Sequence, residues 1–554
     1  MGPFAAMVTD ANFITKNSWL NTIYEKFSFN STQSFILFFG IFTIIAFYIK
    51  ASLGFLAQKS IAEFSHNLKG DLSTRLMKSY LDAPYTVHLT KNSANLVQSV
   101  VTFTDRFCIG LVLSLLTAIS NGVVIVALVT LLVATNAAAS IGIAVVLLVS
   151  LAVLNPLKER LARWGKEGFD ASAEMIRILN HGLGGLKETR IIGCEPYFEA
   201  QMAQAAKKYS KNMGLASGYS NLPRYIVEAV IISFLIIFAF LFVTFNQDNT
   251  QNLTSIFGIF AIASIRLLPA TGNTISCISV IKYNIHSLDS LYAELKEAER
   301  FKNQQRSGTL QQKDLHSPDK LDFSSEIAIE NLVYKYPNAE SNALNEITFS
   351  INKGQSIGLI GKSGSGKTTL VDVLMGLLTP KSGDILLDGV SVYPQLRAWQ
   401  NLIGYVPQSI FLIDDTLERN IAFGVPDNLI DRQRIEKAVA AAQLTEVIER
   451  LPMGLNTTVG ERGVLLSGGQ RQRVGIARAL YHEKEILVFD EATAALDNET
   501  ENLITEATKA LSGSKTIVII AHRLSTIEHC DRIYRLEQGS ITQSGNYQTV
   551  VLER

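Results

Sequence analysis

The chain has 554 residues, enough for two or more domains, and its 50 Lys and Arg residues are balanced by 50 Asp and Glu residues. This balance leaves no net basic field that would favour nucleic acid as a partner. The mean hydropathy of +0.20, with 47% hydrophobic residues, is high for a soluble protein and predicts membrane segments. The four cysteines lack metal-ligand or C-x-x-C spacing, which predicts ordinary reduced thiols.

The first 33 residues carry two features. Residues 1–10 lack the basic start and the long apolar core of a secretory signal. Residues 3–8 resemble the outer end of a membrane span, so we expect the rest of a first span to precede Met1; a true five-span protein is the alternative. An apolar stripe after the possible cap Ser18 predicts an amphipathic helix, which could be a packed surface helix. The stripe consists of Trp19, Leu20, Ile23, Tyr24 and Phe27.

Five further apolar stretches are long enough to span a membrane. They are residues 34–56, 107–133, 137–155, 225–245 and 253–270. The long segments 57–106 and 157–221 hold six and ten Lys or Arg residues, whereas the short connections on the other side hold only Lys16 and Lys26. The excess of positive charge places the two long segments in the cytosol.

These segments predict a helical transmembrane domain over residues 1–302. The two cytosolic segments have apolar helical periodicity, which predicts helices rather than long polar loops. A polar stretch over residues 303–326 predicts a linker. Residues 327–554 alternate short strands and helices, as an α/β domain does.

The most specific motif is a complete G-x-x-x-x-G-K-[ST] phosphate loop at residues 361–368, between a predicted buried strand and a predicted helix. Its glycines let backbone N–H groups surround an anion at a helix N-terminus. Lys367 would reach the β- and γ-phosphates of ATP, and the Thr368 hydroxyl would bind Mg²⁺. The expected ATP-binding residues here are Gly361, Ser363, Gly364, Ser365, Gly366, Lys367, Thr368 and Thr369.

Further motifs follow in order. Residues 458–463 read Thr-Val-Gly-Glu-Arg-Gly, and residues 466–470 read Leu-Ser-Gly-Gly-Gln. An apolar strand ends in the acids Asp490 and Glu491, and Ala-Leu-Asp follows at residues 495–497. His522 comes after another apolar strand. Taken together over residues 327–540, these motifs resemble the ATP-binding cassette (ABC) transporters, with Ala494 where many members have Ser.

This resemblance implies an exporter-type half-transporter, whose all-α membrane domain precedes an α/β P-loop ATPase domain. It also implies that the tips of the two long cytosolic segments lie near residues 84–92 and 184–196. It implies that Tyr336 stacks on adenine and that Gln408 and Asp490 join Thr368 at Mg²⁺. Glu491, Gln408 and His522 would carry hydrolysis. Ser467, Gly468, Gly469 and Gln470 would contact the ATP held by the phosphate loop of another domain.

Because this chain has one copy of each motif, the resemblance implies that it acts as a dimer. The simplest such dimer is a homodimer with two hydrolytic sites. A soluble ABC ATPase of the DNA-repair type is the alternative from a different class, and the five expected spans argue against it. The expected location is the cytoplasmic membrane, with the ATPase domain in the cytosol.

Ionisable residues within the spans bear on the cargo. Lys50 and Arg266 lie about 24 and about 20 Å from the outer ends of their spans at ~1.5 Å per residue, and Arg224 opens a span from the cytosolic side. All three cations would lie in the inner half of the bilayer, where a phosphate headgroup enters. Alternatively, they extend to the interface, and Arg224 pairs with Glu228 at i, i+4.

The membrane half also resembles the bacterial lipid-linked oligosaccharide flippases, through Pro223-Arg224-Tyr225, Val227-Glu228, residues 266–269 and residues 286–289. That family places arginines where this chain has Lys50, Arg224 and Arg266, and another where it has Asn273. The resemblance implies a polyprenyl-pyrophosphate glycan as the cargo. It also implies that the apolar stripe after Ser18 forms an amphipathic helix outside the membrane. An exporter of drugs, other lipids or peptides is the alternative, and its cavity would be apolar or aromatic.

Overall fold

A computed structural model describes residues 18–27, 29, 31–135, 137–245, 250–307, 321–337, 339–491, 498–521 and 523–552, with isolated positions 4, 7 and 14. Contacts divide the chain into two units. The first unit comprises Met1–Asp82 and Lys91–Glu299, and the second comprises Ala83–Thr90 and Arg300–Arg554.

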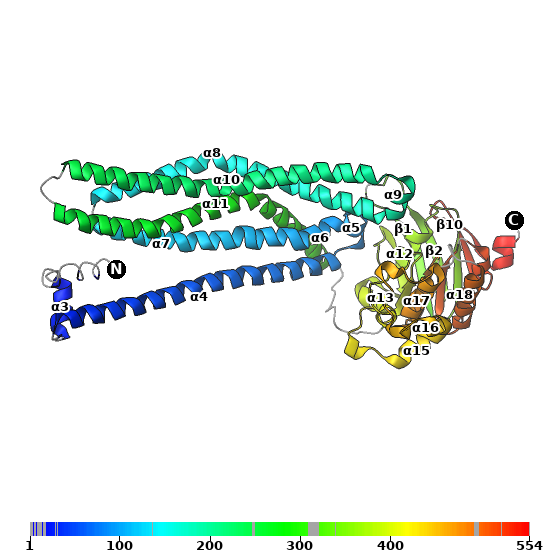
Figure 1. The fold of residues 1–554 in the computed structure, drawn as a ribbon. Coiled ribbons are helices and arrows are strands. Elements are labelled where there is room, and N and C mark those ends of the chain that lie inside the picture. The colour runs from blue at the N-terminus through cyan, green and yellow to red at the C-terminus, as the bar shows by residue number, and fades with distance from the viewer. Residues whose placement is uncertain are drawn as a thin grey trace. The chain divides into compact units, whose positions relative to one another are not determined.

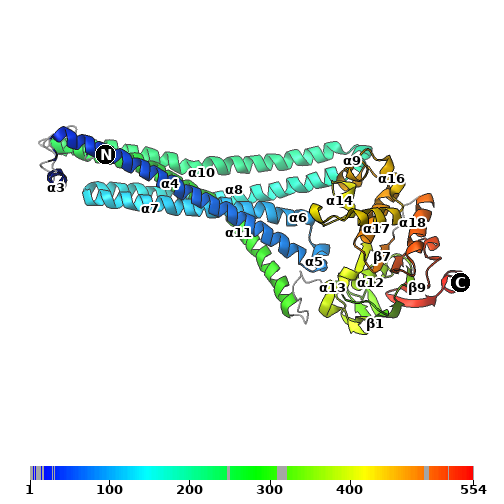
Figure 2. The ribbon, with the colours of Figure 1, turned by 90° about the horizontal axis from the view of Figure 1, so that it is seen from below.

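Long helices build the first unit (Figure 1). They are α4 (Thr32–Leu81), α7 (Leu113–Thr135), α8 (Ala137–Gly184), α10 (Glu195–Phe245) and α11 (Thr250–Ser307). Ser31 is the N-cap of α4, because its side-chain oxygen accepts a hydrogen bond from the N–H of Ser34 at 3.2 Å. Helices α8 and α10 run side by side in both views (Figure 2).

The five stretches expected to span a membrane all lie within helical segments of this unit. Among the described residues, Thr32–Leu81 and Asn95–Thr130 are long and apolar enough to cross a membrane, and their most apolar windows are not buried inside the protein. Large apolar side chains such as Leu37 and Ile41 are exposed along α4, as they are on a surface that faces lipid.

Two short segments before α7 form π-helices, Ser99–Phe103 and Arg106–Val112, after the short α6 (Ser93–Gln98). Such a wide turn disturbs the regular backbone hydrogen bonds. The Val100 carbonyl accepts hydrogen bonds from the hydroxyls of Ser73, at 3.0 Å, and Thr104, and Lys69 pairs with Asp105 at 2.6 Å. The polar contacts from α4 therefore hold this irregular turn in place.

Short helices lie at both expected cytosolic tips, α5 (Tyr85–Thr90) and α9 (Leu186–Ile192). Directly after α5, the Lys91 ammonium lies 3.1 Å from Glu294 and 2.7 Å from Glu297 of α11. The Tyr80 hydroxyl at the end of α4 donates to Glu294 at 2.9 Å. This charged cluster therefore holds Lys91 and the end of α4 against α11 within the first unit.

The apolar stripe near the N-terminus forms α3 (Ser18–Lys26). Leu20 is fully buried in a cluster with Met7, Ile14 and Phe35, and Tyr24 meets Phe35 edge to face at 5.3 Å. Packing on the protein therefore accounts for much of the stripe, whereas Phe27 is exposed. The side chains of Ser18 and Trp19 lie outside the described residues.

The segment expected to be a linker begins later than the sequence predicted. Helix α11 continues to Ser307, so residues 303–307 are helical. Gln and Arg have high helix propensity, which lets the helix extend past the last apolar residues. Residues 308–320 lie outside the described part of the chain.

Two sheets form the core of the second unit. The smaller has the order β2-β1-β4-β5, from β1 (Glu326–Tyr334), β2 (Leu344–Asn352), β4 (Ser382–Leu387) and β5 (Val390–Ser391). The larger has the order β10-β9-β3-β8-β7-β6, from β3 (Ser356–Ile360), β6 (Ile403–Val406), β7 (Ile486–Asp490), β8 (Thr516–Ile520), β9 (Arg532–Glu537) and β10 (Ser540–Gly545). The five strands β9, β3, β8, β7 and β6 run parallel to one another. Strand β10, at the edge of the sheet, is antiparallel to β9.

The helices of this unit include α12 (Lys367–Leu374), α13 (Leu396–Leu402), α14 (Leu417–Ile421), α15 (Arg432–Ala441), α16 (Thr445–Arg450), α17 (Gly468–Tyr481) and α18 (Asn498–Leu511). Strands β3, β7 and β8 are buried at every position, as expected for apolar runs in a parallel sheet. The carboxyl ends of these strands meet at one edge, the usual ligand-binding edge of an open α/β sheet. The phosphate loop follows β3, and Asp490 ends β7.

Candidate functional site

The phosphate loop connects β3 to α12 in a conformation that depends on glycine. Gly361 has a φ of 151°, and a Cβ atom there would lie 2.2 Å from the carbonyl oxygen of Leu536. Gly366 has a φ of 102° and directly precedes the first residue of α12. A Cβ atom at Gly366 would lie 2.9 Å from the carbonyl oxygen of Ala343. The loop can therefore approach β9 at Gly361 and Ala343 at Gly366 this closely only without side chains at these two positions.

Lys367 begins α12 and is 5% exposed. Its ammonium donates to the carbonyl oxygens of Gly361 at 2.9 Å and Lys362 at 3.1 Å. Burial lowers the pKa of this ammonium, while the carboxylates of Glu491 and Asp490 act in the opposite direction. The charge is therefore held inside the loop, where a phosphate would bind.

A cavity of about 660 Å³ opens beside the loop. Seven of the expected ATP-binding residues and the expected catalytic residue Glu491 line it: Tyr336, Ser363, Gly364, Gly366, Lys367, Thr368, Thr369 and Glu491. The Tyr336 and Thr369 hydroxyls lie 3.1 Å apart. This volume is in the range of pockets that hold a small-molecule ligand such as a nucleotide.

One wall of this cavity consists of residues that the sequence did not predict for the ATP site. That wall is formed by Ser341, Asn342, Ala343, Asn345, Gln538 and Gly539. The two segments are joined by a hydrogen bond from the N–H of Asn345 to the carbonyl of Gly539 at 2.8 Å. Only the glycine between β9 and β10, with its φ of 78°, gave a local signal, that of a turn.

The acidic end of the cavity brings together two expected catalytic residues. The Gln408 amide donates to the Glu491 carboxylate at 2.7 Å, and the Tyr405 hydroxyl donates to Asp490 at 3.1 Å. Glu491 has a φ of 49°, in the left-handed region. Gln408 follows β6 and Glu491 directly follows β7, and these two strands are neighbours in the sheet. Asp497 and His522 lie outside the described residues.

Burial raises the pKa of the Asp372 carboxyl on α12 to about 6, with a further contribution from Asp490. A raised folded-state pKa stabilises the protein at low pH, and this stability is lost as the pH rises from the unfolded pKa to the folded one. Asp372→Asn should therefore raise the unfolding temperature at about pH 7.5 and should do so much less at about pH 4.5.

Asp388 provides a control, because its pKa is shifted in the opposite direction, below the ordinary value. Burial acts against its ionisation, but the N–H groups of Ser324, Ser325 and Glu326, at 2.7, 2.7 and 2.8 Å, lower its pKa overall. Asp388→Asn should destabilise the protein at neutral pH, and this loss should shrink as the pH falls through the folded pKa. Thermal unfolding of both variants over this pH range checks the prediction. Equal shifts at both pH values for Asp372→Asn would contradict it.

Ser467 is the N-cap of α17, and Ser467 and Gln470 form a capping box. The N–H of Gln470 donates to the Ser467 hydroxyl at 3.2 Å, and the Gln470 side chain accepts from the N–H of Ser467 at 2.9 Å. None of the four expected residues at positions 467–470, all of them described, lines the cavity at the phosphate loop of the same chain.

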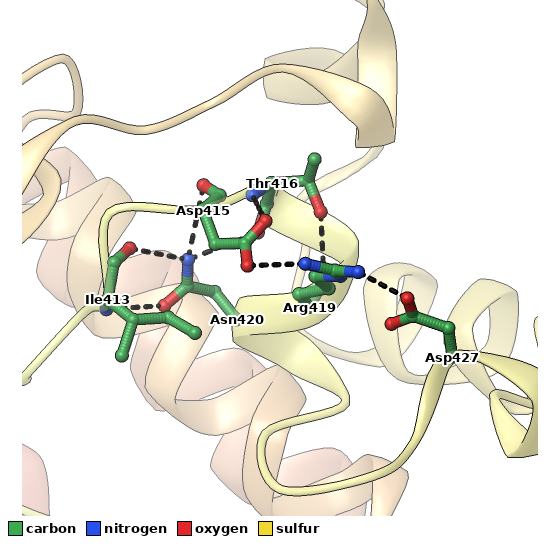
Figure 3. Close-up of polar contacts among 6 residues, drawn as sticks. All are labelled: Ile413, Asp415, Thr416, Arg419, Asn420 and Asp427. Atoms are coloured by element: carbon green, nitrogen blue, oxygen red, sulfur yellow. Dashed lines mark hydrogen bonds and ion pairs between the residues drawn. The ribbon is translucent and has the colours of Figure 1, made fainter. Parts of the chain in front are cut away.

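A polar cluster follows Gln408 in the chain (Figure 3). Asn420 of α14 is fully buried and exchanges two hydrogen bonds with the backbone of Ile413, both at 3.0 Å. Arg419 pairs with Asp415 at 2.8 Å and also with Asp427. The Thr416 side chain caps α14 by accepting from the N–H of Arg419 at 3.2 Å. These contacts give the segment a defined shape outside any strand.

The three expected substrate cations lie on three different helices. Lys50 is exposed on α4, where it has an interaction partner, and Arg224 and Arg266 belong to α10 and α11. The side chains of Arg224 and Arg266 lie outside the described residues.

The fold and the site together define a membrane-helix domain fused to a nucleotide-binding domain, and comparisons identify the family. The family model for the ABC transporter transmembrane region matches residues 1–267, and the ABC transporter model matches residues 344–494. This chain therefore belongs to the ABC transporter family. It binds ATP and couples ATP hydrolysis to transport across a membrane.

Two similar proteins are named ATP-dependent lipid A-core flippases. The one from Cupriavidus metallidurans is 30% identical over 89% of this chain and 81% of its own length. The one from Shewanella frigidimarina is 29% identical over 95% of this chain and 86% of its own length. A solved structure of a bacterial Atm1-family ABC exporter with ATP bound has a TM-score of 0.76 at 21% identity, covering 96% of this chain and 91% of that chain. This last likeness concerns the fold.

Proposed function

We propose that this chain is half of a homodimeric flippase that uses ATP to move a phosphate-bearing glycolipid across the cytoplasmic membrane. The favoured cargo is a polyprenyl-pyrophosphate oligosaccharide. The observation that carries the proposal is the set of cations on three separate helices, Lys50, Arg224 and Arg266. A phosphate that leaves water needs a fixed positive partner, because an unpaired charge in a medium of low dielectric constant is costly.

The names of the relatives favour a second cargo, lipid A-core, which is also a phosphate-bearing glycolipid. Both cargoes place anionic groups near the headgroup region and therefore use the same cations. An exporter of drugs or peptides would not need these charges.

The ATP site is assigned as follows. Tyr336 stacks on adenine, and the eight residues predicted for the phosphate loop, with Lys367 among them, hold the phosphates. Thr368, Gln408 and Asp490 offer hydroxyl, amide and carboxylate oxygens, the hard donors that Mg²⁺ prefers. When bound, Mg²⁺ neutralises charge on the phosphates. Glu491 orients the attacking water and accepts its proton, held by the 2.7 Å hydrogen bond from Gln408. His522 contacts the terminal phosphate.

The dimer is supported by the position of residues 467–470. They do not line the cavity of their own chain, so a second copy is needed to bring Ser467, Gly468, Gly469 and Gln470 to the bound ATP. The basic content of the two long connecting segments supports the orientation with the ATPase domain in the cytosol.

Vesicles that contain the purified protein test the cargo. Flipping of polyprenyl-pyrophosphate glycan, of lipid A-core and of a neutral drug is measured for the native chain and for the triple variant Lys50→Gln, Arg224→Gln and Arg266→Gln. We expect the variant to lose at least about tenfold in flipping of the preferred glycolipid, since charge-assisted contacts are the strong ones.

Lys59→Gln is the matched control, because Lys59 lies on the same helix and pairs with Glu63 at 3.5 Å on an exposed surface. It should flip the glycolipid at nearly the native rate. ATPase rates on the same samples separate loss of cargo binding from loss of folding. Native flipping by the triple variant, or a preference of the native chain for the neutral drug, would overturn the glycolipid assignment.

A further inference from the structure

The segment that follows Gln408 lies directly against α17, the helix that Ser467 begins. A Cβ atom at Gly475 of α17 would lie 2.4 Å from the Cδ1 atom of Ile410. One at Gly463, in the turn before α17, would lie 2.5 Å from a Cδ1 atom of Leu412. Both glycines therefore leave room for side chains of this segment, which packs against α17 and the preceding turn without a gap.

Arg478 of α17 adds polar contacts to this packing. Its Nη1 donates to the carbonyl of Phe411 at 3.1 Å, and its Nε donates to the carbonyl of Asn420 at 2.9 Å. Its guanidinium carbon lies 4.6 Å from the centre of the Phe423 ring. Only a planar group with several donors makes these contacts at once, so lysine could not replace them all.

Asn420 closes the other side of the loop. It is fully buried, and its side chain holds the backbone of Ile413 through two hydrogen bonds at 3.0 Å while also donating to the Thr416 carbonyl at 3.1 Å. Arg478 therefore holds residues 411 and 420, the two ends of a loop that Asn420 keeps folded. Because buried polar groups need partners, loss of one contact weakens the others.

We infer that Arg478 is a positioning residue that makes the segment after Gln408 and the helix begun by Ser467 move as one body. Gln408 contacts Glu491 in the ATP cavity of its own chain, whereas Ser467 serves the ATP of the second copy under the proposed dimer. Arg478 thus transmits ATP occupancy at one site to the residues that complete the other site. The inference rests on the proposed dimer but not on the cargo.

Arg478→Lys tests the inference in the full-length protein without cargo. We expect turnover to fall by about tenfold and the Hill coefficient for ATP to fall toward one, while the dissociation constant for a fluorescent ATP analogue stays within about twofold. We expect turnover to fall while ATP affinity is kept, because the residues that line the cavity remain and only their connection to Ser467 is weakened. A merely structural role would lower the unfolding temperature and reduce binding and turnover together.

Arg473→Lys is the matched control. Arg473 lies on the same helix and donates to the carbonyl of Gln443 at 2.7 Å, outside residues 410–423, which contact Arg478. It should keep native turnover and native cooperativity. If Arg478→Lys does not fold, Ile410→Ala decides, since it removes the contact with Gly475 and should lower turnover in the same selective way.

Native turnover and cooperativity in Arg478→Lys, or losses equal to those of Arg473→Lys, would overturn the inference. A failure of the dimer would look different: the native protein would then have the mass of a single chain in solution and would itself show a Hill coefficient of one, as would all the variants.

Discussion

Glu491→Gln is expected to reduce ATP turnover by on the order of 10² to 10⁴ and to leave ATP binding intact, because removal of a general base costs rate rather than affinity. The substitution keeps the size of the side chain. Gln408, 2.7 Å away, loses a charged acceptor and keeps a neutral one. The residues that hold the phosphates, with Lys367 among them, are unchanged, so ATP still binds and the dimer of ATPase domains accumulates in its closed form.

Turnover, analogue binding and the fraction of closed dimer measure the three parts of this result. Glu483→Gln is a matched control, since Glu483 also has a positive φ, 52°, but pairs on the surface with Arg434 at 3.4 Å. It should hydrolyse ATP at the native rate. Full hydrolysis by purified Glu491→Gln would remove Glu491 from the proposed catalytic role.

The local parts of the ATP site could be predicted from the sequence, because strand, glycine loop and helix are adjacent in the chain. The phosphate loop lies between β3 and α12 as expected, and Asp490 ends a fully buried strand. The wall around Asn345 and Gly539 could not be predicted in the same way. These two residues are far apart in the chain and meet only because β10 continues the sheet beside β9 near the start of β2.

The contact between α17 and the segment that follows Gln408 could not be predicted from the sequence, for a different reason. Gly475, Asn420 and Arg478 are ordinary residues in or beside helices, and nothing in their spacing says that they contact one loop. Their roles come from packing: Asn420 is buried with its amide turned toward the backbone of Ile413, and Gly475 makes room for Ile410. Tertiary contacts of this kind have no period in the sequence.

In the membrane half, apolar runs predicted the positions of the long helices but not their local irregularities. The π-helical turns at Ser99–Phe103 and Arg106–Val112 depend on Ser73 of α4, which supplies a hydroxyl to the Val100 carbonyl. The apolar stripe near Trp19 was open to two interpretations. The burial of Leu20 against Phe35 favours the packed surface helix, because that face is not available to lipid.

Lys367→Ala is expected to weaken ATP binding by on the order of 10², because it removes a charged donor that faces the phosphates. In the native chain the ammonium bonds to the carbonyls of Gly361 and Lys362, so it is already inside the loop when ATP arrives. Lys362→Ala is the control, since Lys362 belongs to the same loop but its side chain is exposed. It should bind the analogue with nearly native affinity. Equal losses in the two variants would mean that general basic charge, rather than Lys367, attracts ATP.

Mixing two inactive variants, Lys367→Ala and Ser467→Arg, tests whether the ATP site is shared between two chains. Lys367→Ala keeps a native Ser467, and Ser467→Arg keeps a native phosphate loop, so each variant alone has two defective sites. In a mixed dimer, one site combines both defects and the other combines two native halves. Random exchange of chains should therefore restore about a quarter of the native sites, whereas two independent inactive chains would restore none. Hydrolysis at the full rate by an isolated, monomeric ATPase domain would contradict the shared site. Recovery on mixing would instead require that Lys367 of one chain and Ser467 of the other act on the same ATP.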